Sequence, residues 1–212
     1  QNVAIFDPSL TADSVNKTAV LAMTHLSTRR DGTEDTGIYL AAADKNCKNW
    51  RLVGSAEFEA KRDDLIAPDG RTLLASGTWR YETPSIVFDP GDTDRPWKLF
   101  SYKYFWSHNG NLSLARRYGM IVLRTAAKIE GPWSAEQWLF SAAADYPPPP
   151  YQDLIQNHLN TLDASLAGTS FYARPSVIYD NGVLLMTLSA FNTETSAEKI
   201  ILLVSKKKKK TW

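Results

Sequence analysis

The chain has 212 residues, 43% of them hydrophobic and 22% charged, with a single cysteine. That composition excludes wholesale disorder, a collagen-like repeat and a disulfide-based scaffold. The formal net charge is +1, but five basic residues form one run at 206–210. The rest of the chain has 19 basic and 23 acidic residues, which is not the balance of a nucleic-acid-binding domain.

No apolar run approaches the roughly 20 residues that span a bilayer. The longest runs, at 183–188 and 200–204, have the length of strands. The first residue is Gln1 rather than Met, so we expect that a leader has been removed and that the protein is secreted, extracellular or periplasmic. Aromatic residues make up 11%, which is typical of proteins that stack rings on sugars or bury large flat side chains.

A first unit of strands is predicted over about residues 1–60. It opens on the phrase Asp7-Pro8-Ser9-Leu10 and continues into apolar, β-rich runs at 18–26 and 37–43. A polar turn then leads to Trp50, after which we expect a fourth strand.

A second unit, over about 78–145, repeats this order. Thr83-Pro84-Ser85-Ile86 precedes β-rich runs at 97–105 and 119–125, and the turn Gly131-Pro132-Trp133 leads to another fourth strand. Because Trp133 and Trp50 occupy equivalent turns, we predict that both pack between neighbouring units.

Residues 146–169 interrupt the repeat. Four prolines at 147–150 predict a stiff spacer, and the apolar residues of 151–163 fall at helical spacing, which predicts one short inserted helix.

A third unit, over about 170–212, opens on Arg174-Pro175-Ser176-Val177 and has β-rich runs at 183–191 and 199–205. Its lysine run at 206–210 is interpreted as a solvated turn, with a basic patch for an acidic polymer as the alternative. The unit reaches Trp212 where its fourth strand should begin.

Three four-stranded units that open on one phrase predict an all-β fold, the blades of a β-propeller in a single domain over 1–212. A β-sandwich is the alternative, but it does not require the phrase to recur before the same strands. Proline suits the start of an innermost strand, where its missing N–H is not needed, and we expect the residue before it to be extended. Since propellers typically have four to eight blades, we expect the chain to be incomplete.

These motifs resemble the five-bladed β-propeller glycosidases, particularly glycoside hydrolase family 43 and its relatives that act on arabinose, xylose and galactose linkages. The resemblance rests on Asp7-Pro8-Ser9-Leu10, on the strand and turn of 37–50, and on Gly131-Pro132-Trp133. It implies a five-bladed propeller, of which about three blades are visible, with Asp7 as the catalytic base. It also implies that a calcium ion could lie near the axis.

The sequence departs from the family pattern at two points. The third-blade aspartate that tunes the acid is replaced by Arg174, and the family's general-acid glutamate lies in a later blade. Glu82 is the nearest substitute.

Residues just before each Pro-Ser phrase should converge on one funnel, because the innermost strands of a propeller surround a single axis. Glycoside hydrolysis needs one carboxyl group to protonate the leaving oxygen and a second to activate water or attack carbon. We therefore predict Asp7 as base and Glu82 as acid, with Arg174 holding a carboxylate or receiving an anionic sugar. The structural alternatives are a turn-starting aspartate at Asp7 and an ion pair of Glu82 with Arg80.

Further side chains are predicted to bind the sugar. Aromatic rings near the second and third phrases could stack on it or pack in the core, and two polar residues lie on the second strands of the first two units. The set is Trp79, Tyr81, Tyr172, His25 and Lys103. No metal-ligand motif accompanies the histidines, so we predict no bound cofactor apart from the calcium that the resemblance implies.

The sequence therefore predicts a glycoside hydrolase-like protein that cleaves extracellular polysaccharide or oligosaccharide with a carboxylate pair. The alternative is a non-catalytic carbohydrate-binding propeller, and a purely structural propeller is the third possibility. The predicted partner is a carbohydrate, without nucleic acid or a membrane span, and the oligomeric state stays open.

Overall fold

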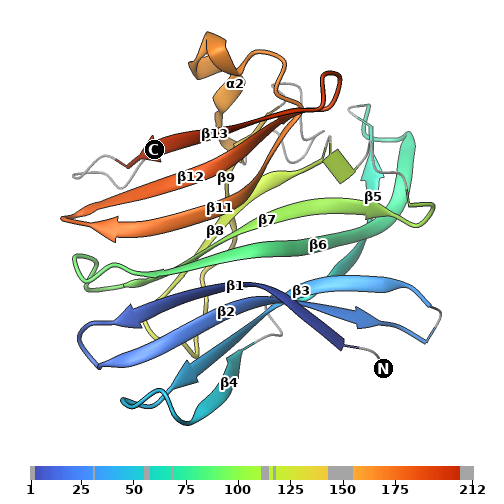
Figure 1. Cartoon of the computed structure of the whole chain (residues 1–212). Helices are drawn as coiled ribbons and strands as arrows, with labels where there is room; N and C mark the ends of the chain where they lie inside the picture. Colours follow the sequence, from blue (N-terminus) through green and yellow to red (C-terminus); the bar gives the residue numbers. More distant parts are fainter. Residues whose placement is uncertain are drawn as a thin grey trace.

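The computed structural model describes residues 3–30, 32–54, 58–67, 69–110, 115–116, 118–142 and 155–205. Over these ranges the protein is built from three β-sheets, as Figure 1 shows. The proline spacer, the lysine run and Trp212 lie outside the described residues. No helix in the described ranges is long and apolar enough to cross a membrane.

The first sheet confirms the predicted four-stranded unit. Its strands are β1 (Val3–Asp13), β2 (Thr18–Thr28), β3 (Glu34–Ala43) and β4 (Trp50–Gly54), and they pair antiparallel in chain order. Each pairs with the next because short polar turns join them, which is the pattern of a meander.

The second sheet has two strands more than the predicted unit. In chain order its strands are β5 (Lys61–Ile66), β6 (Leu73–Phe88), β7 (Trp97–Ser107), β8 (Met120–Ala126), β9 (Gln137–Ser141) and β10 (Ile155–His158). The extra β5 pairs with the first half of the 16-residue β6, and β10 runs parallel to β9 and covers its edge.

The predicted helix is shorter than expected. The described part of 151–163 begins with β10, followed by α2 (Leu159–Leu162) and then a 3-10 turn, η3 (Ala164–Leu166). The backbone at 155–158 pairs with the edge of β9, so tertiary pairing overrides the helical spacing of the side chains.

The third sheet contains β11 (Phe171–Asp180), β12 (Val183–Asn192) and β13 (Ala197–Val204), again antiparallel in chain order. Its inner strand β11 packs beside β6, and β6 packs beside β1. In Figure 1 these three inner strands cross the view in the same direction, one above another, as the first strands of successive propeller blades do.

Two hydrophobic cores hold the sheets together. The first lies between sheets one and two and contains Leu40, Phe105 and Trp133, and the second, between sheets two and three, contains Phe100 and Met186. Trp133 is 9% exposed, which confirms its predicted packing role. The equivalent prediction for Trp50 is wrong, because this side chain is 43% exposed at the start of the edge strand β4.

Each Pro-Ser phrase forms a bulge in its inner strand. The residues before the prolines, Asp7, Thr83 and Arg174, have φ angles of 50°, 48° and 54°, and the strand register shifts at each of them. The expectation of an extended residue there is wrong, because the bulge inserts one unpaired residue that turns into the left-handed region.

The serines of the first two phrases then bond to the next sheet. Ser9 Oγ accepts a hydrogen bond from the backbone N–H of Ile86 (3.1 Å), and Ser85 Oγ accepts one from the N–H of Val177 (2.9 Å). Both donors are the residue directly after the next phrase's serine, so the same bond recurs between successive sheets. The repeated phrase is therefore a device that aligns neighbouring inner strands.

We predict that Ser85→Ala lowers the free energy of unfolding by about 1 to 3 kcal/mol, because it leaves the Val177 N–H buried without an acceptor. Ser176→Ala is the matched control, since Ser176 holds the same place in the third phrase but is exposed. Urea unfolding of both variants measures the difference, and equal losses would contradict the role given to this bond.

Candidate functional site

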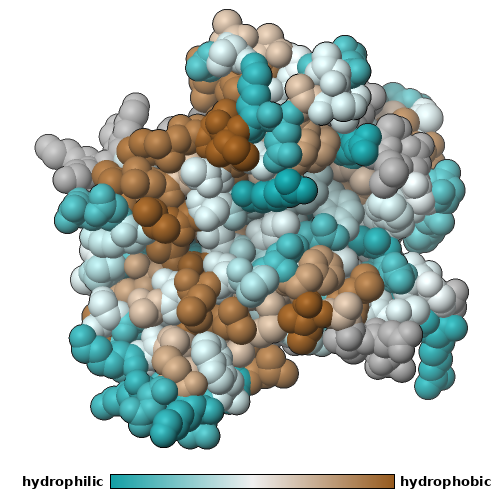
Figure 2. Space-filling view, in the orientation of Figure 1, coloured by the Kyte–Doolittle hydropathy of each residue, from teal (hydrophilic) through white to brown (hydrophobic). Residues whose placement is uncertain are grey.

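The three phrases line one open hollow of about 870 Å³, bounded by β1, β6 and β11. Asp7, Thr83 and Arg174 all border it, as predicted, whereas Glu82, which was predicted to share the site, is not among its lining residues. Figure 2 shows hydrophilic residues across the middle of this face and a hydrophobic band on the left, where β1, β11 and β13 end. Exposed apolar residues of those strand ends include Leu10, Ile178 and Val204.

A buried threonine links the first two phrases. Thr24 Oγ1, on β2, donates to Asp7 Oδ2 at 3.4 Å and accepts from the backbone N–H of Thr83 at 3.0 Å. The Asp7 carboxylate is thereby oriented by the neighbouring strand and joined to the second sheet. Sequence reasoning missed Thr24, since only the pairing of β1 with β2 brings it to the phrase.

Glu82 lies beside this bond, one residue before Thr83. Its pKa is raised, chiefly because the carboxyl group is largely buried, while a hydrogen bond from the Tyr104 hydroxyl opposes the shift and the negative charge of Asp7 adds to it. Glu82 therefore holds its proton more readily than an ordinary glutamate. The Thr24 bridge between Asp7 and the backbone of Thr83 brings the two carboxyl groups to neighbouring strands.

The alternative interpretation of Glu82 as one half of an ion pair with Arg80 is not what the structure shows. Arg80 donates to the backbone carbonyl of Glu34, and its Nε lies 3.9 Å from Asp35 Oδ1. Its guanidinium also covers the ring of Trp106 at 4.9 Å. Arg80 acts on Glu82 only as a nearby positive charge that favours the ionised form.

Aromatic rings connect Glu82 with the third phrase. From Tyr104 the series runs to Tyr102, with 5.3 Å between ring centroids, and on to Phe171 at 6.3 Å. Phe171 stacks on Phe191 at 4.7 Å, and the Arg174 guanidinium lies 5.3 Å from the Phe191 ring. The two tyrosines are on β7, which the sequence predicts only as an apolar, β-rich run.

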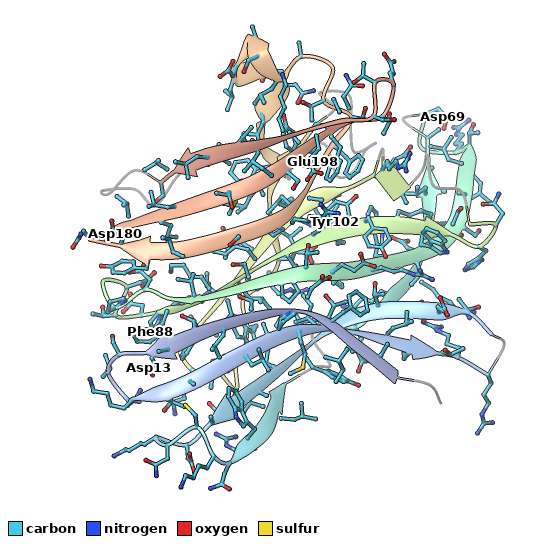
Figure 3. The ribbon with its side chains drawn as sticks, in the orientation of Figure 1. Asp13, Asp69, Phe88, Tyr102, Asp180 and Glu198 are labelled. Carbon is cyan, nitrogen blue, oxygen red and sulfur yellow. The ribbon has the colours of Figure 1, made fainter. Side chains whose placement is uncertain are left out.

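Arg174 holds a carboxylate. Its Nη1 lies 3.2 Å from Oε1 of Glu198, which comes from β13. Both side chains are exposed, and Figure 3 shows Glu198 on the sheet next to that of Tyr102. The third phrase thus carries a positive charge, Arg174, and the carboxylate beside it, Glu198, comes from a different strand. Sequence reasoning missed Glu198 because no motif marks it.

Three predicted sugar-binding residues lie away from the hollow. Trp79, Tyr81 and Lys103 are buried in the first core, where Lys103 Nζ bonds to Glu136 Oε1 at 2.5 Å and lies 4.8 Å from the Trp79 ring. Successive strand residues point to opposite faces, so Tyr81 points away from the face that carries Glu82. These side chains are not placed to stack on a sugar.

Tyr172 is likewise a core residue. It is fully buried in the second core and donates to Asn160 Oδ1 at 2.5 Å, so its neighbour Phe171 takes the exposed side of the strand. His25 borders a separate pocket, described below. Among the described residues no three His, Cys, Asp or Glu side chains are grouped to hold a metal ion, so the calcium that the family resemblance implies stays a prediction.

No family model and no curated protein sequence matches the chain. Solved structures do. An endo-arabinanase of glycoside hydrolase family 43 from Bacillus licheniformis is similar over 95% of this chain and 51% of its own, with a TM-score of 0.53 and 17% identity. A family 117 glycoside hydrolase of the marine bacterium Zobellia galactanivorans is similar over 96% of this chain and 52% of its own, with a TM-score of 0.53 and 14% identity.

The likeness shows the fold. The chain has the all-β architecture of the five-bladed propeller glycosidases, with three blade-like sheets, and it spans about half the length of these two structures.

We predict that Glu82→Gln becomes more stable relative to the wild type as the pH rises from 4 to 8, as measured by the difference between their free energies of unfolding. Because the folded protein raises the pKa of Glu82, the wild type loses stability as the pH rises through that pKa, whereas glutamine does not ionise. Urea unfolding at several pH values measures this.

Glu130→Gln is the control of opposite sign. The hydrogen bond from Arg51 lowers the pKa of Glu130, so the wild type gains stability as Glu130 ionises. The free energy of unfolding of Glu130→Gln should therefore fall relative to that of the wild type over the same pH range. Parallel curves for Glu82→Gln and the wild type would show that Glu82 is not held in its protonated form.

Proposed function

We propose that the protein is a glycoside hydrolase that cleaves bonds of an extracellular polysaccharide or oligosaccharide, with Glu82 and Asp7 as its carboxyl pair. The observation that carries the proposal is the Thr24 bridge, which joins the Asp7 carboxylate at the wall of the hollow to the backbone of Thr83, the residue after Glu82. The fold shared with propeller glycosidases supports it.

Glu82 is the proposed acid. Its raised pKa keeps a proton available for the oxygen of the leaving sugar. Once the proton has been given up, the carboxylate accepts the hydrogen bond of the Tyr104 hydroxyl, and the positive charge of Arg80 stabilises it further. Burial thus raises the fraction of Glu82 that carries a proton before the reaction. Tyr104 and Arg80 lower the free energy of the carboxylate that remains after the proton is transferred.

Asp7 is the proposed base or nucleophile. The hydrogen bond from Thr24 holds its carboxylate at the wall of the hollow, where it can take a proton from water as the water attacks the anomeric carbon, or attack that carbon itself. The Arg174 and Glu198 pair, across the hollow, offers a donor and an acceptor for sugar hydroxyl groups.

The proposed substrate class is an arabinan or a related plant-type polysaccharide, in line with the endo-arabinanase whose fold the chain shares. Such a polymer does not pass through a cell membrane, so we propose that the protein acts outside the cytoplasm. Arg174 favours a second candidate function, a carbohydrate-binding propeller without catalysis, because a cation replaces the carboxylate of the family pattern in the third phrase.

We predict that Asp7→Asn and Glu82→Gln each lower kcat/KM by about 10²- to 10⁴-fold, the usual contribution of acid or base catalysis. The assay follows sugar released from nitrophenyl glycosides and from arabinan, xylan and galactan. Glu130→Gln, an exposed carboxylate ion-paired with Arg51, is the control and should keep full activity. Unchanged turnover in either variant would remove that residue from the mechanism.

Sugar binding by the wild type without release on any of these substrates would favour the binding module. Calorimetry with the same polysaccharides makes that measurement.

A further inference from the structure

A second pocket, of about 250 Å³, lies beside the first sheet where β2 and β3 are joined. In the described part of the chain it shares no lining residue with the large hollow. Its polar lining consists of His25, Ser27, Arg29, Asp35, Thr36, Tyr39 and Glu59. The volume is below the about 300 to 1,000 Å³ of drug-sized ligand sites, so the pocket suits a single small ring.

His25 is the group in this pocket that lacks partners. It is 5% exposed, and neither Nδ1 nor Nε2 has a hydrogen-bond partner among the described residues. Its ring stacks on Tyr39, with 3.8 Å between centroids and 11° between planes. Buried polar groups are nearly always hydrogen-bonded, so an imidazole held this firmly with two free nitrogens points to a bound molecule.

Asp35 provides a third polar atom without a hydrogen-bond partner, although Arg80 Nε lies 3.9 Å from it. Its Oδ2 pairs with Arg29, but its buried Oδ1 has no hydrogen-bond partner among the described residues. Arg29 and Arg80 both lie against Asp35, and Glu59 adds a second negative charge, so the charges around the pocket balance and favour a neutral ligand. Burial lowers the pKa of His25, which leaves the ring neutral, with one donor and one acceptor nitrogen.

Hydroxyl groups match this set of atoms. A hydroxyl donates to a carboxylate oxygen such as Asp35 Oδ1, and a second hydroxyl both donates to and accepts from a neutral imidazole. A neutral sugar ring offers several hydroxyls at fixed spacing. Gly37 lets the imidazole pack against the backbone, because a Cβ at this position would come within 2.7 Å of both His25 Nε2 and the carbonyl oxygen of Phe58.

The pocket is connected to the proposed catalytic acid. Thr36 borders it, and Thr36 Oγ1 lies 3.4 Å from the Tyr104 hydroxyl, which bonds to Glu82. One threonine and one tyrosine thus separate the pocket from the carboxyl group.

We propose that this pocket is a subsite for one neutral sugar unit, held by His25 and Asp35. The inference rests on the proposed function for its role in a longer substrate, whereas the binding of sugar at the pocket is independent of catalysis.

The test combines NMR with kinetics on His25→Phe, which keeps a ring against Tyr39 and removes both nitrogens. In the wild type, ¹³C-labelled histidine signals are followed during titration with arabinose, xylose, galactose and the corresponding trisaccharides. The His25 signals, assigned by their loss in the variant, should move in a saturable way with at least one sugar. His108→Phe is the control, since His108 is exposed and lies outside this pocket.

The variant should bind the responsive trisaccharide at least tenfold more weakly than the wild type. The KM of the variant for that oligosaccharide should rise by a similar factor. Thermal unfolding of the variant checks that it is folded, and His25→Gln, whose amide supplies both a donor and an acceptor, should restore part of the affinity.

Two results would overturn the proposed subsite: His25 signals that do not shift with any sugar, or equal sugar affinities of His25→Phe and the wild type. Either would mean that water rather than sugar occupies the pocket. A His25 response without any sugar release would instead leave the subsite standing and remove the proposed hydrolase activity. The two failures are therefore distinguishable.

Discussion

The structure depends on one repeated constraint, the bulge and serine bond of the Pro-Ser phrase. A left-handed backbone is uncommon outside glycine and is strained for a β-branched residue such as Thr83. It persists because the next residues tie each inner strand to its neighbour, as Ser85 Oγ does with the N–H of Val177. The three inner strands are therefore held in one register, and the residues at the bulges are turned out of the strand ladder.

That constraint creates the candidate site. Asp7, Thr83 and Arg174 occupy the three bulges, so residues separated by more than 70 positions border one hollow, and Glu82 lies one residue before the second bulge. The threonine bond between Asp7 and the backbone of Thr83 depends on the same register. Strain of this kind is commonly found at functional sites, where the surrounding structure compensates for it.

The sequence predicts the strands, the repeat and the convergence of the phrases, because apolar periodicity and a recurring motif are local signals. It does not predict which face a side chain takes beyond a bulge, since a shift of one residue exchanges the two faces of a strand. Tyr81 and Tyr172 are therefore predicted at the sugar site and lie in the cores, whereas Tyr104, which no motif marks, bonds to Glu82. Glu198 could not be foreseen, because only the pairing of β12 with β13 brings it to Arg174.

The most direct test of this account is the pKa of Glu82, measured by ¹³C NMR of its carboxyl group in the wild type and in Asp7→Asn. If the bulges bring the two carboxyl groups together, the pKa of Glu82 lies above that of an ordinary glutamate and falls when the charge of Asp7 is removed. A pKa of Glu82 at the ordinary value, or one that is the same in both proteins, would show that the phrases do not form one site.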